Sequence, residues 1–155
     1  MINEHYPYIA TQKNTIFFFE SVGSQGNIVK AVVFELTKKG KWNLGFGDMR
    51  DDYTVDDKII SNNQDVFKVI STVAKIAYAF IETYPDRTLT IVPVDEKRKI
   101  LYNRVFQRHF EDIDKQFEVV GTIKDYDEPY SIDKIYDEFT LKYKNKSTGN
   151  DEFSI

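Results

Sequence analysis

Cysteine is absent from the 155-residue sequence, and proline, glycine and histidine are scarce, with 4, 7 and 2 copies. Without a thiol the chain can form no disulfide, thiolate zinc site or cysteine nucleophile, so no oxidising compartment is indicated. His5 and His109 lie far apart and neither has a second histidine three or four residues away, so we expect no metal site. No proline-, glycine- or serine-rich linker and no internal repeat divides the chain, which indicates a single unit.

Long apolar runs and an excess of positive charge are missing as well. The longest apolar run, at residues 76–81, falls far short of the roughly 20 residues that a membrane-spanning helix needs. The first ten residues lack the basic and apolar regions of a signal peptide. Because 25 Asp and Glu outnumber 21 Lys and Arg, for a net charge of -4, nucleic acid is not the expected partner. We expect a cytoplasmic protein that makes no membrane contact.

The remaining composition is typical of a globular domain, with 41% hydrophobic residues. Period-two alternation and β-branched runs predict strands, and residues 21–26 are expected to form a turn. The expected strands are residues 15–20, 28–37, 42–48, 88–94, 117–123 and 138–144. With two helices, the order βββαβαββ predicts a single α+β domain with a mixed, mostly antiparallel sheet over residues 1–145, followed by a flexible C-terminal tail at residues 146–155.

Both predicted helices are amphipathic. The first covers residues 65–84, with Ser71 and Thr72 on its polar face, and Pro85 ends it. The second runs from residue 95 to about residue 113 and points Tyr102 and His109 toward the sheet. Its basic face could dock an acidic partner or nucleic acid, but a solvated helix face explains the same residues. These basic residues are Lys97, Lys99, Arg104 and Arg108.

Two polar segments precede the first helix, and each has two interpretations. Ser61, Asn62 and Asn63 could bind a ligand or anion at the helix start, but plain capping of the helix is the preferred interpretation. Several carboxylates in the preceding loop could chelate calcium or magnesium, but they lack the spacing of a calcium-binding loop, so a solvated loop is the preferred interpretation. These carboxylates are Asp48, Asp51, Asp52, Asp56 and Asp57.

The segment DEKRKILYNR, at residues 95–104, resembles the last helix of the GNAT superfamily of acyl-CoA-dependent N-acyltransferases. In that family a strand runs into a polar residue, here Asp95, and a Leu-Tyr pair follows, here Leu101 and Tyr102. The resemblance implies a GNAT-like fold, acetyl-CoA as cosubstrate, and Tyr102 as the general acid that protonates the departing thiolate. The alternative for Tyr102 is a helix tyrosine packed on the sheet.

GNAT enzymes also carry a glycine-containing loop before their first long helix, and its backbone N–H groups hold the pyrophosphate of the coenzyme. Residues 61–65 occupy that place here and contain neither a glycine nor a basic residue, and Asp65 adds a negative charge. Arg98 lies one turn before Tyr102 and could bind an anion or a partner's carboxylate. Pairing with Asp48 or another local Asp is the preferred interpretation of Arg98.

A second likeness covers most of the chain. The sequence is similar to a family of small uncharacterised bacterial proteins that share a Phe-Gly-Asp strand end, an acidic stretch, Ser-Asn-Asn before a Lys-Val helix, and an Arg-x-x-Leu-Tyr helix leading into Phe-x-Val-x-Gly. The corresponding residues of this chain are 46–48, 51–57, 61–63, 68–73, 98–102 and 117–121. This likeness supports the fold and implies no reaction.

Together these features predict an uncharacterised intracellular protein that binds a ligand or partner, without catalysis, on a GNAT-like scaffold. The expected partner is an unidentified protein or a second copy of the chain, because 12 Phe, 10 Tyr and 1 Trp are difficult to hide in a domain of this size. No cofactor is expected. The alternative is an acyl-CoA-dependent N-acyltransferase, with Tyr102 as general acid and acetyl-CoA as cosubstrate.

Overall fold

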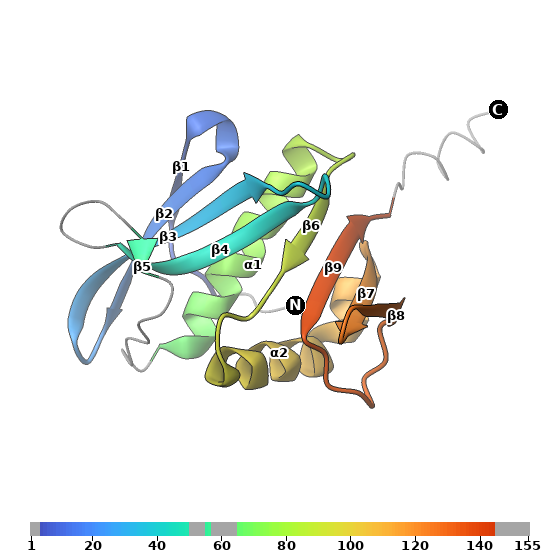
Figure 1. The fold of residues 1–155 in the computed structure, drawn as a ribbon. Helices are drawn as coiled ribbons and strands as arrows, with labels where there is room; N and C mark the ends of the chain where they lie inside the picture. The colour runs from blue at the N-terminus through green and yellow to red at the C-terminus, as the bar shows by residue number, and fades with distance from the viewer. Residues whose placement is uncertain (1–3, 50–54, 57–64, 145–155) are drawn as a thin grey trace.

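A computed structural model describes residues 4–49, 55–56 and 65–144 (Figure 1). Over these residues the chain is a single α+β domain in which two helices pack on a mixed, mostly antiparallel sheet, as the sequence predicted. In chain order the elements are β1 (Tyr8–Thr11), η1 (Gln12–Asn14), β2 (Ile16–Gly23), β3 (Gly26–Leu36), β4 (Trp42–Met49), β5 (Val55–Asp56), α1 (Val66–Thr83), β6 (Thr88–Ile91), α2 (Glu96–Asp114), β7 (Phe117–Ile123), β8 (Tyr126–Pro129) and β9 (Glu138–Tyr143). The predicted C-terminal tail lies outside the described residues.

The sheet consists of two antiparallel halves joined by one short parallel contact. Its strand order is β1-β2-β3-β4-β6-β9-β7-β8, with β5 paired to β4. The parallel contact joins β4 to β6 through two residue pairs, Trp42 with Leu89 and Asn43 with Thr90. Beyond these pairs the two strands diverge (Figure 1). The two halves of the sheet are therefore held together mainly by the side chains and helices that pack against both of them.

Aromatic stacking reinforces the parallel junction. The guanidinium of Arg87, in the turn after α1, lies 3.9 Å from the ring centre of Trp42 and 3.5 Å from that of Tyr84. The Trp42 ring also lies 5.6 Å from the ring of Phe80. Such contacts between a cation and aromatic faces stabilise a structure by about 0.5–2 kcal/mol each. The start of β4 and the end of α1 are thereby fixed to each other.

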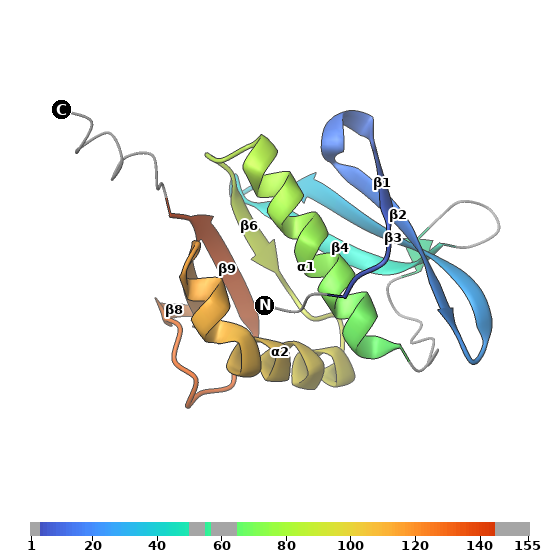
Figure 2. The same cartoon turned by 180° about the vertical axis from the view of Figure 1, so that it is seen from behind.

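Both helices cover the same face of the sheet, and Figure 2 shows them lying across it from behind. Their apolar faces share one hydrophobic core with the strands, in which Phe80 of α1 stacks on Phe34 and Phe106 of α2 stacks on Phe139. Pro85 follows the end of α1, as predicted. Neither helix combines the length and the apolar character needed to cross a membrane, as far as the described residues extend.

Two local predictions were wrong near the N-terminal half of the sheet. The turn expected at residues 21–26 is confined to Ser24 and Gln25, because β2 continues to Gly23 and β3 begins at Gly26. Ser71 and Thr72 of α1 are buried instead of solvent-exposed. The segment before β1 passes over α1 at this point, and the backbone N–H of Tyr6 donates a hydrogen bond of 2.8 Å to Oγ1 of Thr72. The sequence of this segment has no apolar periodicity, so the sequence analysis could not predict that it covers Ser71 and Thr72.

The segment between β7 and β9 is ordered by one buried tyrosine. Tyr136 is completely buried, and its ring packs over Gly121 of β7. Its backbone N–H and C=O both bond to the side chain of Asn103 in α2, at 2.9 Å each. Its hydroxyl donates to Glu128 of β8, a strand that the sequence analysis did not predict. One residue thus connects α2 through its backbone with β7 and β8 through its side chain.

Replacing Gly121 with alanine tests this packing. A Cβ at Gly121 would lie 2.3 Å from two atoms of the Tyr136 ring, far inside van der Waals contact. We expect Gly121→Ala to lower the free energy of unfolding by about 3 kcal/mol, measured by urea denaturation, because overpacking a closed core forces its neighbours to move.

Gly45→Ala is the matched control. Gly45 is also a strand glycine, but its added Cβ would meet the carbonyl oxygen of Val33 at an ordinary 3.6 Å. We expect this variant to stay within about 1 kcal/mol of the natural protein. Equal destabilisation by the two substitutions would contradict the role assigned to the Tyr136 ring.

Candidate functional site

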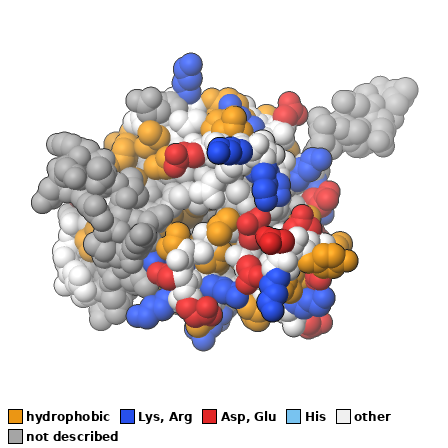
Figure 3. Space-filling model, in the orientation of Figure 1, with side chains coloured by type: hydrophobic (Ala, Val, Ile, Leu, Met, Phe, Trp, Pro, Cys, Tyr) orange, Lys and Arg blue, Asp and Glu red, His pale blue; other side chains and the backbone are white. Residues whose placement is uncertain are grey.

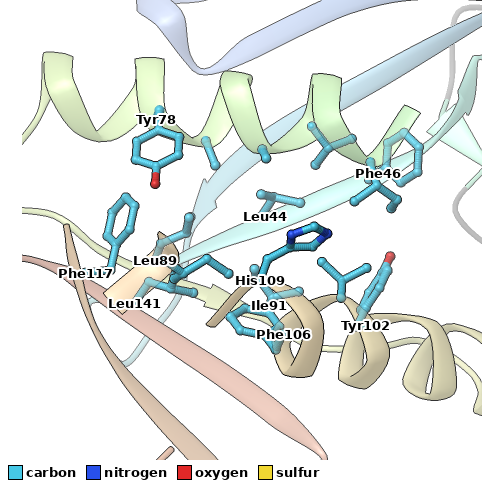
Figure 4. Close-up of a pocket in the computed structure, with 16 residues that line it drawn as sticks. Leu44, Phe46, Tyr78, Leu89, Ile91, Tyr102, Phe106, His109, Phe117 and Leu141 are labelled. Atoms are coloured by element: carbon cyan, nitrogen blue, oxygen red, sulfur yellow. The ribbon is translucent and has the colours of Figure 1, made fainter. Parts of the chain in front are cut away.

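An apolar cavity lies between α1, α2 and the sheet, beside the point where β4 and β6 diverge (Figure 4). Its volume is about 110 Å³, and it opens partly to solvent. Carbon atoms form almost its whole wall. The lining residues are Leu44, Phe46, Ile70, Val73, Ala74, Ala77, Tyr78, Leu89, Ile91, Tyr102, Val105, Phe106, His109, Ile113, Phe117 and Leu141.

The cavity exists because short side chains of α1 face it. Ala74 and Ala77 belong to the α1 wall, while the opposite wall on α2 carries larger residues such as Phe106 and Ile113. Since an alanine reaches only to its Cβ, the space between the two helices is not filled at this level. The sequence signal for this space was the presence of two alanines on a helix face whose other apolar residues are larger. The sequence analysis did not predict a cavity from it.

Three ionisable side chains reach the cavity from different sides, namely Tyr78, Tyr102 and His109. In Figure 4 the His109 ring points toward the middle of the cavity, the Tyr78 hydroxyl points toward Phe117, and the Tyr102 hydroxyl points toward the Phe46 end. Burial lowers the pKa of His109, and the neighbouring Arg108 cation lowers it further. Burial raises the pKa of Tyr78. Both groups are therefore held in their neutral forms, which suits an apolar site.

A second, smaller pocket of about 30 Å³ occupies a crevice between β4, the segment that follows β6, and the start of α2. Leu44, Phe46 and Tyr102 line both this crevice and the cavity, so the two spaces share a wall. The crevice is more polar, because Asn43 and Arg98 also line it. Tyr102, expected to face the sheet, therefore stands where the cavity and the crevice meet.

Arg98 is buried and forms an ion pair with Asp95. The residue is only 8% exposed, and its Nη1 lies 2.6 Å from a carboxylate oxygen of Asp95. The same carboxylate caps α2 by accepting a bond of 2.9 Å from the backbone N–H of Arg98. The prediction that Arg98 pairs with a local aspartate is thus confirmed, with Asp95 as the partner. Asp48, the other candidate, pairs with the buried Lys30.

The structure does not test the ligand-binding residues predicted at the start of α1. Ser61, Asn62 and Asn63 all lie outside the described residues. Asp65 is described, and its carboxylate accepts hydrogen bonds of 2.5 Å from the hydroxyls of Tyr6 and Ser21. Burial, and then this bond to Asp65, raise the pKa of Tyr6. A carboxylate thus sits at the N-terminus of α1.

Other charged groups form local pairs. Within the described residues no group of three or more His, Asp or Glu side chains is arranged to hold a metal ion. On the basic face of α2, Lys99 lies 2.6 Å from Asp137, and this contact raises the pKa of Lys99 and lowers that of Asp137. Figure 3 shows acidic and basic side chains interspersed on the visible face. No single-sign field that would collect phosphates is visible on this face.

Comparisons with known proteins identify a family but no activity. The model of a family described as a family of unknown function (DUF6934) matches residues 2–144. Searches of the curated proteins and of the solved structures found no match. The chain's resemblance to GNAT enzymes therefore stays a prediction.

The lowered pKa of His109 predicts a pH dependence of stability. In the unfolded chain the imidazole takes up a proton near its ordinary pKa of 6.5, whereas in the folded chain it does so only at lower pH. Between these two values the unfolded state binds more protons. The contribution of neutral His109 is thus complete above about pH 6.5 and is lost as the pH falls toward the folded-state pKa. We expect the free energy of unfolding to decrease over this window, and His109→Gln to reduce the slope. An unchanged slope in the variant would show that another group titrates.

Proposed function

Since the chain belongs to this family of unknown function, DUF6934, its activity has to be inferred from its own residues, and we propose that it is a non-catalytic binding protein. Its ligand is a small molecule with an apolar body, which occupies the cavity between α1 and α2. The observation that carries this proposal is the cavity itself, with its volume of about 110 Å³ and its almost wholly carbon-lined wall.

The dimensions and chemistry of the cavity support ligand binding. Water gains few hydrogen bonds in such a space, and an apolar cavity of about 150 Å³ engineered into another protein stays dry and binds benzene. The walls belong to two long helices and to strands, so the site is largely preformed. An apolar ligand would therefore gain contacts without much ordering of the protein.

The residues that line the cavity favour binding over catalysis. Apart from Tyr78, Tyr102 and His109, all of them are aliphatic, phenylalanine or alanine. Among the residues that the structure describes, no carboxylate, lysine or serine that could serve as a base or nucleophile lines the cavity beside the imidazole. An apolar ligand held there would meet no activated group.

The second candidate function is acyl transfer from acetyl-CoA, with Tyr102 as general acid. One observation favours it, which is the position of Tyr102 in a crevice beside β4 and the segment after β6, near the point where these parallel strands diverge. The fit to the coenzyme is poor at the start of α1, where the Asp65 carboxylate occupies the helix end that would otherwise attract a pyrophosphate. We therefore rank transfer second and propose no cofactor.

Filling the cavity tests the leading proposal. We expect 1-octanol, a neutral probe, to bind and to shift the amide signals of α1 and α2 residues around the cavity in two-dimensional NMR spectra. Ala77→Leu places three more carbon atoms in the space and should weaken octanol binding about tenfold or more. The same side chain should keep or raise the melting temperature, because it fills a void.

Lys75→Leu is the matched control, because it adds the same apolar side chain at an exposed position of the same helix. It should leave octanol binding unchanged. If octanol bound equally well to Ala77→Leu, or shifted signals scattered over the surface, the cavity would not be the binding site.

Acetyl-CoA separates the two candidate functions. A coenzyme present at about 100 times its dissociation constant would add about 2.7 kcal/mol to stability, which is roughly 5 °C or more in melting temperature. We expect no such rise at millimolar acetyl-CoA. Two results together would replace the binding proposal with the transferase. Acetyl-CoA would raise the melting temperature of both the natural protein and Tyr102→Phe, and only the natural protein would transfer the acyl group.

A further inference from the structure

The cavity and the crevice between β4 and the segment that follows β6 meet at Tyr102, and their walls differ in chemistry. The cavity is apolar, whereas Asn43 and Arg98 line the crevice. We propose that together they bind a linear, medium-chain aliphatic carboxylate, with its chain between α1 and α2 and its carboxylate toward Arg98. This inference rests on the proposed binding function and names the class of ligand.

The shape of the cavity indicates a linear chain. On α1 the lining residues run from Ile70 to Tyr78, and on α2 from Tyr102 to Ile113. At about 1.5 Å per helical residue these stretches span roughly 12 and 16 Å. A zigzag chain of about eight carbons, with bonds of about 1.5 Å, extends roughly 9 Å between its end carbons and therefore fits within both stretches. Two helices that flank an elongated space favour such a chain over a compact or branched group.

The two ends of this space are unequal. At one end, Tyr78 and Phe117 close the cavity with aromatic rings that lie 5.1 Å apart between their centres. At the other end, Phe46 and Tyr102 form the wall shared with the crevice. A ligand with one apolar and one polar end therefore has a single favourable orientation, with its polar end beside Tyr102.

The charge beside this end favours a carboxylate. Arg98 has only 8% of its surface exposed, so its guanidinium acts in surroundings that screen charge weakly. A guanidinium has five N–H donors in a planar fork, and it can contact more than one carboxylate. The Asp95 side chain is 37% exposed, so solvent screens its repulsion of a second anion more effectively.

Isothermal titration calorimetry with octanoate, 1-octanol and 2-propylpentanoate tests the proposal on the complete natural chain. Octanoate and octanol differ in the head group, while 2-propylpentanoate is a branched isomer of octanoate. We expect octanoate to bind about tenfold more tightly than either of the others. Equal affinity of octanol would overturn the carboxylate assignment, and equal affinity of the branched isomer would overturn the linear chain.

Arg98→Gln locates the head group. This variant should bind octanol within about twofold of the natural protein, which shows that the cavity is intact, and it should lose the preference for octanoate. A preference that survives in Arg98→Gln would overturn the role of Arg98. If this variant does not fold, the comparison of the three ligands on the natural chain still decides the ligand class. Failure of all three ligands to bind would instead overturn the proposed binding function.

Discussion

The short parallel contact between β4 and β6 is the constraint on which the rest of the structure depends. Only two residue pairs join the strands, so the halves of the sheet separate beyond Asn43 and Thr90. The apolar faces of α1 and α2 must therefore cover two diverging surfaces at once, and side chains cannot close the space completely. The cavity and the crevice are the result, which places the candidate site where the topology creates a gap.

The halves of the sheet are stabilised by different means. The N-terminal half depends on stacked phenylalanines beneath α1 and on the Asp65 carboxylate, which holds Tyr6 and Ser21. The C-terminal half depends on Asn103, whose buried amide satisfies both backbone groups of Tyr136. A buried amide with all its partners is stabilising, whereas its loss leaves two orphaned backbone groups. Asn103 therefore positions the segment before β9 against α2.

Much of the fold could be predicted from the sequence, because periodicity records burial. The helices and the six predicted strands follow apolar patterns that one face of a sheet or helix requires. By contrast, β1 and β8 were missed, since edge strands bury little and leave a weak pattern. The site was predicted only in part. Tyr102 and Arg98 were identified from a motif, but the cavity depends on how far apart two helices lie, which no local pattern encodes.

The stacking of Arg87 on Trp42 gives this protein a built-in optical probe. Trp42 is the only tryptophan of the sequence, and it lies at the seam between the two halves of the sheet. Its indole emission therefore reports the environment of this seam, whereas circular dichroism averages over all elements. Fluorescence of Trp42, excited selectively, can therefore detect separation of the two halves of the sheet. It distinguishes this event from the unfolding of either half.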